Sequence, residues 1–97
     1  MNFLQQLAAT AIRNQVVAAL RADCPAELNE ALETLLADGT AVNTIRDFVM
    51  AHMKTPADIT AAALAALPYT DTTAALLQST PALAQYLADT AKAKLPH

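Results

Sequence analysis

The side chains that could take part in catalysis or metal binding are few and widely separated along the chain. His52 lies within a predicted helix and His97 is the last residue, and neither has a Cys, His or carboxylate at the spacing of a zinc site. Ser79 is the only serine and has no base near it in the sequence. A single glycine is too few to build a phosphate-binding loop. We therefore expect no enzymatic activity, no cofactor and no metal.

Two further groups have both a chemical and a structural interpretation. The glutamates at 27, 30 and 33 could gather on one helix, but a solvated face opposite a leucine stripe explains them better. Cys24 has no second cysteine to pair with, which favours a reducing, cytoplasmic setting. Cys24 either carries a reactive thiol or is simply a small residue beside a helix start, and we favour the second interpretation.

The composition predicts a helical protein of one domain, residues 1–97. Twenty-four of the 97 residues are alanine and only one is glycine, which favours helix strongly, and no strand-like alternation is present. The net charge of −3 argues against nucleic-acid binding through phosphate contacts. No run reaches the ~18 to 20 apolar residues that a membrane span needs.

Prolines and the glycine predict where the helices begin and end. Pro25, Pro56 and Pro81 each follow a Cys or Thr and precede an alanine, a pattern typical of the first turn of a helix. Gly39 and Pro68 follow apolar runs and predict helix ends. The resulting fold class is all-α, a compact bundle of about six short helices, at residues 2–22, 25–38, 41–53, 56–67, 72–79 and 81–94.

Apolar residues recur at three- and four-residue intervals within these segments. In the first helix they predict a single stripe, made of Leu4, Leu7, Ala8, Ala11, Ile12, Val16, Ala19 and Leu20. The alanine-rich helix 56–67 is predicted to lie centrally, because methyl-sized side chains allow a close approach of neighbours. Residues 1–22 contain no acid, so this helix could also lie on an anionic membrane surface. We favour its packing into the bundle.

The function predicted from these features is a non-enzymatic protein–protein interaction module, such as a small adaptor, regulator or inhibitor. The expected partner-binding surface comprises Arg46, Asp47, Met50 and Lys54, because Met50 lies off the main apolar stripe and methionine suits adaptable contacts. Met50 could instead fill space in the core. A homodimer is also expected, since it would bury the alanine-rich and methionine-bearing faces.

The alternative function is a DNA-binding transcriptional regulator with a helix-turn-helix-like unit in residues 56–94. A recognition helix needs Arg, Lys, Asn or Gln directed at bases and phosphates. The last two predicted helices offer only Gln78, Gln85, Lys92 and Lys94. Nucleic acid is therefore the less favoured partner.

Overall fold

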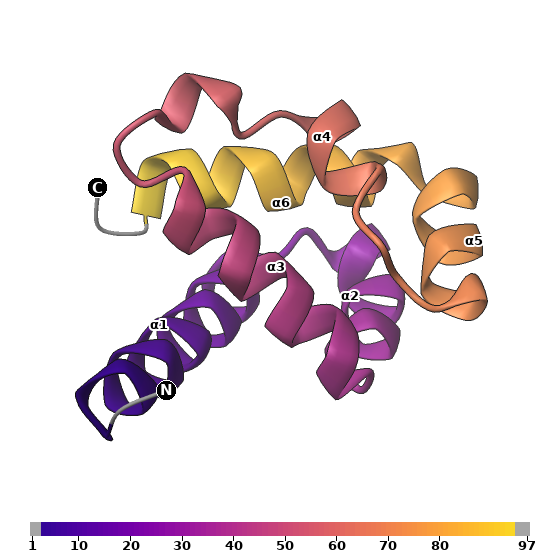
Figure 1. The fold of residues 1–97 in the computed structure, drawn as a ribbon. Helices are drawn as coiled ribbons and strands as arrows, with labels where there is room; N and C mark the ends of the chain where they lie inside the picture. The colour runs from indigo at the N-terminus through magenta and orange to yellow at the C-terminus, as the bar shows by residue number, and fades with distance from the viewer. Residues whose placement is uncertain (1–2, 95–97) are drawn as a thin grey trace.

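Six α-helices follow one another along the residues that the computed structural model describes, 3–94 (Figure 1). Two single 3₁₀ turns, η1 and η2, precede α2 and α4, and these residues contain no strand. The prediction of an all-α bundle is confirmed. The elements in order are α1 (Phe3–Ala22), η1 (Ala26–Leu28), α2 (Asn29–Leu36), α3 (Gly39–Ala51), η2 (Pro56–Asp58), α4 (Ala61–Ala65), α5 (Asp71–Ser79) and α6 (Pro81–Lys94).

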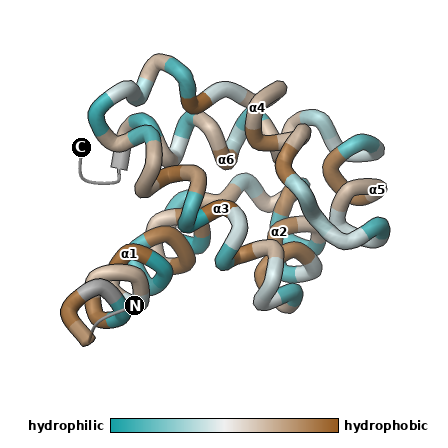
Figure 2. The backbone as a smooth tube through the Cα atoms, viewed as in Figure 1, coloured by the Kyte–Doolittle hydropathy of each residue, from teal (hydrophilic) through white to brown (hydrophobic). Residues whose placement is uncertain are grey.

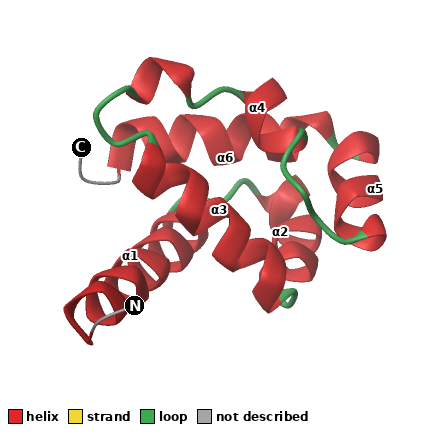
Figure 3. Cartoon of the chain, in the orientation of Figure 1, coloured by secondary structure: helices red, strands yellow, loops and turns green. Residues whose placement is uncertain are grey.

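The core lies where α6 crosses the other helices. α4 packs along α6, α1 packs on both α3 and α6, and short loops join the helices (Figures 1 and 3). Burial of large aliphatic side chains is the main stabilising contribution to a domain of this size. The most deeply buried of them come from the five helices after α1 and from the connection before α4, and are Leu32, Leu35, Val42, Val49, Ile59, Leu64, Leu77 and Leu83.

Two tyrosines tie helix ends to the core. The Tyr86 hydroxyl on α6 donates to the Leu20 carbonyl near the end of α1 over 2.5 Å, and the Tyr69 hydroxyl donates to the Leu64 carbonyl over 2.6 Å. The last carbonyls of a helix have no partner within it, so Tyr86 satisfies the Leu20 carbonyl. The Leu64 carbonyl also accepts from the Leu67 N–H over 3.4 Å, and Tyr69 adds a shorter bond to it. Burial raises the pKa of Tyr69, which keeps this hydroxyl protonated as a donor.

The predicted role of Gly39 is wrong, because this residue begins α3 instead of ending the preceding helix. Gly39 has no positive φ, so the left-handed conformation expected of a helix-ending glycine is not used. Asp38 is the N-cap of α3, and its Oδ1 accepts from the backbone N–H groups of Thr40 and Ala41 over 3.1 and 3.3 Å.

The other oxygen of Asp38 joins two parts of the chain. Its Oδ2 accepts from the hydroxyls of Thr70 and Thr73, at 3.1 and 2.7 Å, and these threonines lie at the start of α5. Hydrogen bonds that favour the charged form lower the pKa of Asp38. One carboxylate therefore caps α3 and fixes α5 against it.

Two of the three proline starts open only a 3₁₀ turn. Pro25 precedes η1 and Pro56 begins η2, whereas Pro81 begins the long helix α6 as predicted. The single helix predicted at 56–67 is wrong. Ile59 lies between η2 and α4 with a non-helical backbone and no exposed surface, and Thr60 caps α4 by accepting from the Ala63 N–H. Burying the Ile59 side chain accounts for the break.

The alanine-rich segment is central only in part. Leu64 is fully buried and α4 packs along α6, but Ala62 and Ala66 are exposed. The buried residues of this segment are thus Ile59 and Leu64, and not the face of Ile59, Ala63 and Leu67 that helical spacing indicates for an unbroken helix.

The single apolar stripe predicted for the first helix is also wrong. Hydrophobic residues occur along the whole of α1 (Figure 2). Val16 and Leu20 are buried in the core, whereas Leu4 and Leu7 remain exposed. Leu7 and Val16 are nine residues apart, about two and a half helical turns, so they lie on opposite sides of α1. From Ile12 onward, α1 packs its apolar side into the bundle, and the turns before it project from one corner of the molecule (Figure 1).

Candidate functional site

The outer face of α3 carries three of the four residues expected to bind a partner. Arg46, Asp47 and Met50 lie on this helix, and the Met50 side chain is 37% exposed. Lys54 is exposed as well, but it lies in the turn that follows the end of α3. Met50 therefore reaches the molecular surface, with the larger part of the residue covered by its neighbours.

An ion pair fixes the charged part of this face. The Arg46 guanidinium contacts Asp47 Oδ1, at 3.0 Å from Nε and 2.9 Å from Nη2, and Nη1 donates to Asn43 Oδ1 over 3.3 Å. The Asp47 side chain is 68% exposed while that of Arg46 is only 18% exposed. The carboxylate is thus presented to solvent with its basic partner held beside it.

A groove that the sequence did not reveal lies beside this face. It is open to solvent, has a volume of about 370 Å³, and separates α3 from the segment that leads out of α4. Its lining comprises Thr44, Asp47, Phe48, Ala51, His52, Leu67 and Pro68. Helical spacing alone places Phe48 and His52 one turn apart on the same side of a helix, but nothing in the local sequence indicates that Leu67 and Pro68 lie opposite them.

An aromatic pair shapes the α3 side of the groove. The rings of Phe48 and His52 have centroids 4.3 Å apart and planes inclined by 35°. His52 Nδ1 lies 2.8 Å from the Phe48 carbonyl oxygen, one turn earlier in α3. With the proton on Nδ1, that contact is a hydrogen bond, and Nε2 is left as an acceptor. His52 is thus held in one orientation as a polar group at an apolar groove.

The titratable groups outside this face, Cys24 and the three glutamates of residues 27–33, have surroundings typical of structural residues. Cys24 is partly buried, and burial, with the nearby carboxylates of Glu27 and Glu33, raises the pKa of its thiol. A raised pKa reduces the fraction of reactive thiolate. Glu27, Glu30 and Glu33 are exposed, as expected of a solvated face, and Glu33 binds Arg21 through two contacts of 2.9 Å. Within residues 3–94, no three metal-binding side chains come together.

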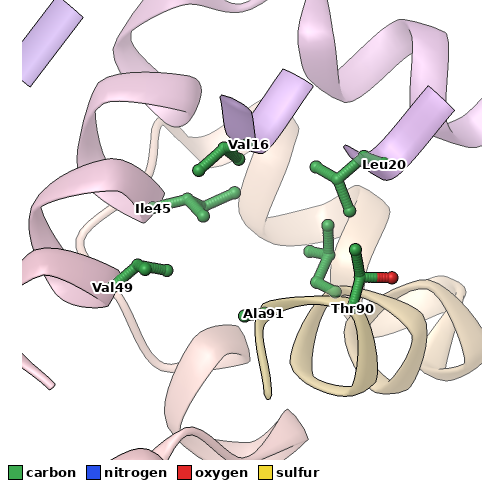
Figure 4. Close-up of a pocket in the computed structure, with 7 residues that line it drawn as sticks. Val16, Leu20, Ile45, Val49, Thr90 and Ala91 are labelled. Atoms are coloured by element: carbon green, nitrogen blue, oxygen red, sulfur yellow. The ribbon is translucent and has the colours of Figure 1, made fainter. Parts of the chain in front are cut away.

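A very small cavity lies where α1, α3 and α6 meet (Figure 4). Its volume of about 10 Å³ is enough for a single water molecule and not for a ligand. The walls are aliphatic apart from the hydroxyl-bearing Thr90, and comprise Val16, Leu20, Ile45, Val49, Leu87, Thr90 and Ala91. This cavity is a minor packing gap in the core.

The polar residues considered for DNA recognition are dispersed. Gln78 is exposed on α5, whereas Gln85 on α6 donates to Asp89 over 2.9 Å. Lys92 lies further along α6, and α4, the first helix of the unit at 56–94, has five residues. These side chains are thus divided between α5 and α6, where Gln85 and Lys92 lie two turns apart.

Among residues 3–94, the other large apolar residues that are exposed lie on α1. Phe3 and Leu4 are 71% and 73% exposed, and Leu7 is 51% exposed. No helix among residues 3–94 has the length and apolar character to cross a membrane.

No protein-family model matches the chain, and neither the curated proteins nor the solved structures contain a match to it.

Proposed function

We propose that this protein is a non-enzymatic module that binds another protein through the α3 surface. This surface is the outer face of α3 together with the groove beside it, and comprises Arg46, Asp47, Phe48, Met50, His52, Lys54, Leu67 and Pro68. The observation that carries the proposal is the groove of about 370 Å³ adjoining an exposed methionine and a fixed ion pair.

The chemistry of this surface suits a protein partner. Interfaces owe most of their affinity to a few large side chains that enter apolar pockets, with polar groups around them. The aromatic ring of Phe48 and the apolar Leu67 and Pro68 supply such a pocket, and Met50 supplies an adaptable neighbour. Asp47, with its carboxylate exposed, gives the rim a charge that selects a complementary partner.

A reducing compartment is part of the proposal, because the chain has one cysteine and that residue is a free thiol. Whether the module acts as an adaptor, a regulator or an inhibitor depends on the partner that it binds.

The test fills the groove without disturbing the core. Ala51 is exposed and lines the groove, so Ala51→Trp should occupy it, and Ala75→Trp places the same side chain on an exposed position of α5 as the matched control. Met50→Lys changes the adjoining face. Each variant is compared with the wild type by capturing partners from the native host and identifying them by mass spectrometry, after a thermal melt has shown that it is folded.

The expected result is a partner retained by the wild type and Ala75→Trp and bound at least about tenfold more weakly by the other two variants. Equal capture by all four proteins would place the binding surface elsewhere. A large loss of thermal stability in Met50→Lys would instead show that Met50 supports the core.

A further inference from the structure

We propose that a second copy of this chain covers the exposed side of α1, through antiparallel pairing of the two α1 helices. This inference stands independently of the α3 surface. The residues concerned form what we call the outer stripe, which comprises Leu4, Leu7, Ala11, Asn14 and Ala18. All five are exposed and lie on the side of α1 away from the core.

The spacing of the outer stripe is that of a helix-pairing seam. Its members recur at intervals of three, four, three and four residues, which is the seven-residue repeat that keeps one side of a helix against a partner helix. Val16 and Leu20, which face the core, lie on the other side of α1. A partner can therefore lie along the outer stripe without displacing any contact with α3 or α6.

The sizes of the side chains favour antiparallel pairing of like with like. The stripe has its two leucines at the beginning and small or medium residues, Ala11, Asn14 and Ala18, after them. An antiparallel partner places the leucines of each copy over the small residues of the other, and large side chains facing small ones pack well. A parallel pair would set Leu4 against Leu4 and Ala18 against Ala18, so the distance between the two helices would differ from one end to the other.

Charge favours the same arrangement. Residues 1–22 contain two arginines and no acid, whereas residues 23–38 contain five acids and no base. This acidic segment begins directly after α1, and one of its acids, Glu33 on α2, reaches Arg21 in the final turn of α1. In an antiparallel pair, the acid-free first turn of one α1, with its positive helix dipole, approaches the acidic segment of the other copy. In a parallel pair the two positive ends would meet.

The area that the two outer stripes can bury sets the expected affinity of the dimer. The outer stripe runs over about 21 Å of helix, from Leu4 to Ala18, and a pair of such helices covers somewhat less than the ~1,000 Å² typical of stable interfaces. We therefore expect a reversible dimer with a dissociation constant between about 10 and 100 μM.

The first experiment measures mass against concentration by sedimentation equilibrium, from about 5 μM to 1 mM, a range that brackets this constant. The wild type should shift from monomer to dimer. Leu7→Glu puts a charge in the seam and should weaken the dimer at least tenfold, whereas Gln6→Glu adds the same charge at an exposed position off the stripe and should leave it unchanged. A monomer throughout the range, or a dimer that survives Leu7→Glu unchanged, would overturn the proposal.

The second experiment determines the orientation with a short thiol cross-linker, in a Cys24→Ser background. Ala11→Cys lies near the middle of the stripe and should give a cross-linked dimer. Leu4→Cys lies at one end and should not, because antiparallel pairing separates the two copies of this position by about 15 Å or more along the helices. Efficient cross-linking through Leu4→Cys would show parallel pairing and overturn the antiparallel arrangement.

A lipid surface is the competing occupant of this stripe. Co-sedimentation of the wild type with vesicles of anionic phospholipid, at low salt, distinguishes it from the dimer. A protein that stays monomeric and sediments with the vesicles, with Leu7→Glu abolishing sedimentation, would assign the stripe to the membrane and refute the dimer. No sedimentation, together with a concentration-dependent dimer, is the expected result.

Discussion

The two longest helices, α1 and α6, use the same residue types in opposite surroundings. In α6 the leucines and alanines at 83, 84, 87, 88 and 91 are all buried. In the first half of α1, Leu4, Leu7, Ala8 and Ala11 are exposed. α6 contacts α1, α4 and α5, whereas the packing of α1 on α3 and α6 buries only residues of its second half. Neighbours, and not helix propensity or composition, therefore decide what an apolar residue contributes here.

The strongest test of this comparison makes the same change in both helices. Leu87→Ala removes a buried side chain beside the small core cavity, and we expect it to lower the free energy of unfolding by about 2 to 5 kcal/mol. Leu4→Ala removes an exposed side chain and should cost less than about 0.5 kcal/mol for the monomer. Urea unfolding at a low protein concentration measures both. Similar losses would mean that the first half of α1 is packed in solution.

The next test concerns the polar link that fixes α5 within the covered part of the molecule. Thr73→Val keeps the shape of a buried side chain but removes the hydroxyl that donates to Asp38 over 2.7 Å. We expect a loss of about 1 to 3 kcal/mol, because a charged acceptor loses its shortest hydrogen bond. Thr72→Val, at an exposed position in the same turn, is the control and should change stability by no more than about 0.5 kcal/mol. An equal effect of both substitutions would assign the loss to helix propensity.

Low pH should weaken the Asp38–Thr73 hydrogen bond, and it should not affect the first half of α1, which has no acidic residue. The pKa of Asp38 in the folded state lies below its ordinary value of 3.8, chiefly through the hydrogen bond from Thr73. Because the pKa is lower in the folded than in the unfolded chain, ionised Asp38 stabilises the fold at pH values above its ordinary pKa. This stabilisation disappears as the pH falls through the folded-state pKa. Thermal melts between about pH 6 and pH 2 should show a fall in stability that begins near pH 4.

The matched variant for this pH series is Asp38→Asn, which cannot ionise. It should be less stable than the wild type at neutral pH, and the difference should shrink as the pH falls below about 4. A difference that stays constant across the series would show that the charge of Asp38 contributes nothing beyond its hydrogen-bonding geometry.

The sequence was sufficient to predict the fold class and most of the helices, because apolar spacing and helix caps are local signals. Pro81 marked the start of α6 correctly, and the helix predicted at 72–79 corresponds to α5 (Asp71–Ser79). The two failures have different causes. Asp38 is a favoured N-cap residue, so the start of α3 follows from a local signal that competes with Gly39, whereas Ile59 lies outside the helix in a helix-favouring segment, where the core buries its side chain.

In the candidate site, too, some residues could be placed from local sequence and others only from the structure. The residues Arg46, Asp47 and Met50 share a helix, so their common face followed from helical spacing. The groove beside them depends on Leu67 and Pro68, which lie about twenty residues away from Phe48 in the sequence. No local pattern brings such distant segments together, and this part of the site required the structure.

The smallest expected effect comes from the ion pair at the end of α1. Arg21 and Glu33 make two contacts of 2.9 Å, but both side chains are about half exposed, and exposed pairs contribute little because water and salt screen them. We expect Arg21→Gln to lower the melting temperature by less than about 3 °C, and less still in ~0.5 M salt. The pKa of Glu33, which the Arg21 hydrogen bond lowers, should rise toward its ordinary value when followed by NMR. A loss as large as that of Leu87→Ala would mean that α1 is held to the bundle by this charge pair, and the buried Val16 and Leu20 would no longer explain why one half of the helix is packed and the other is free.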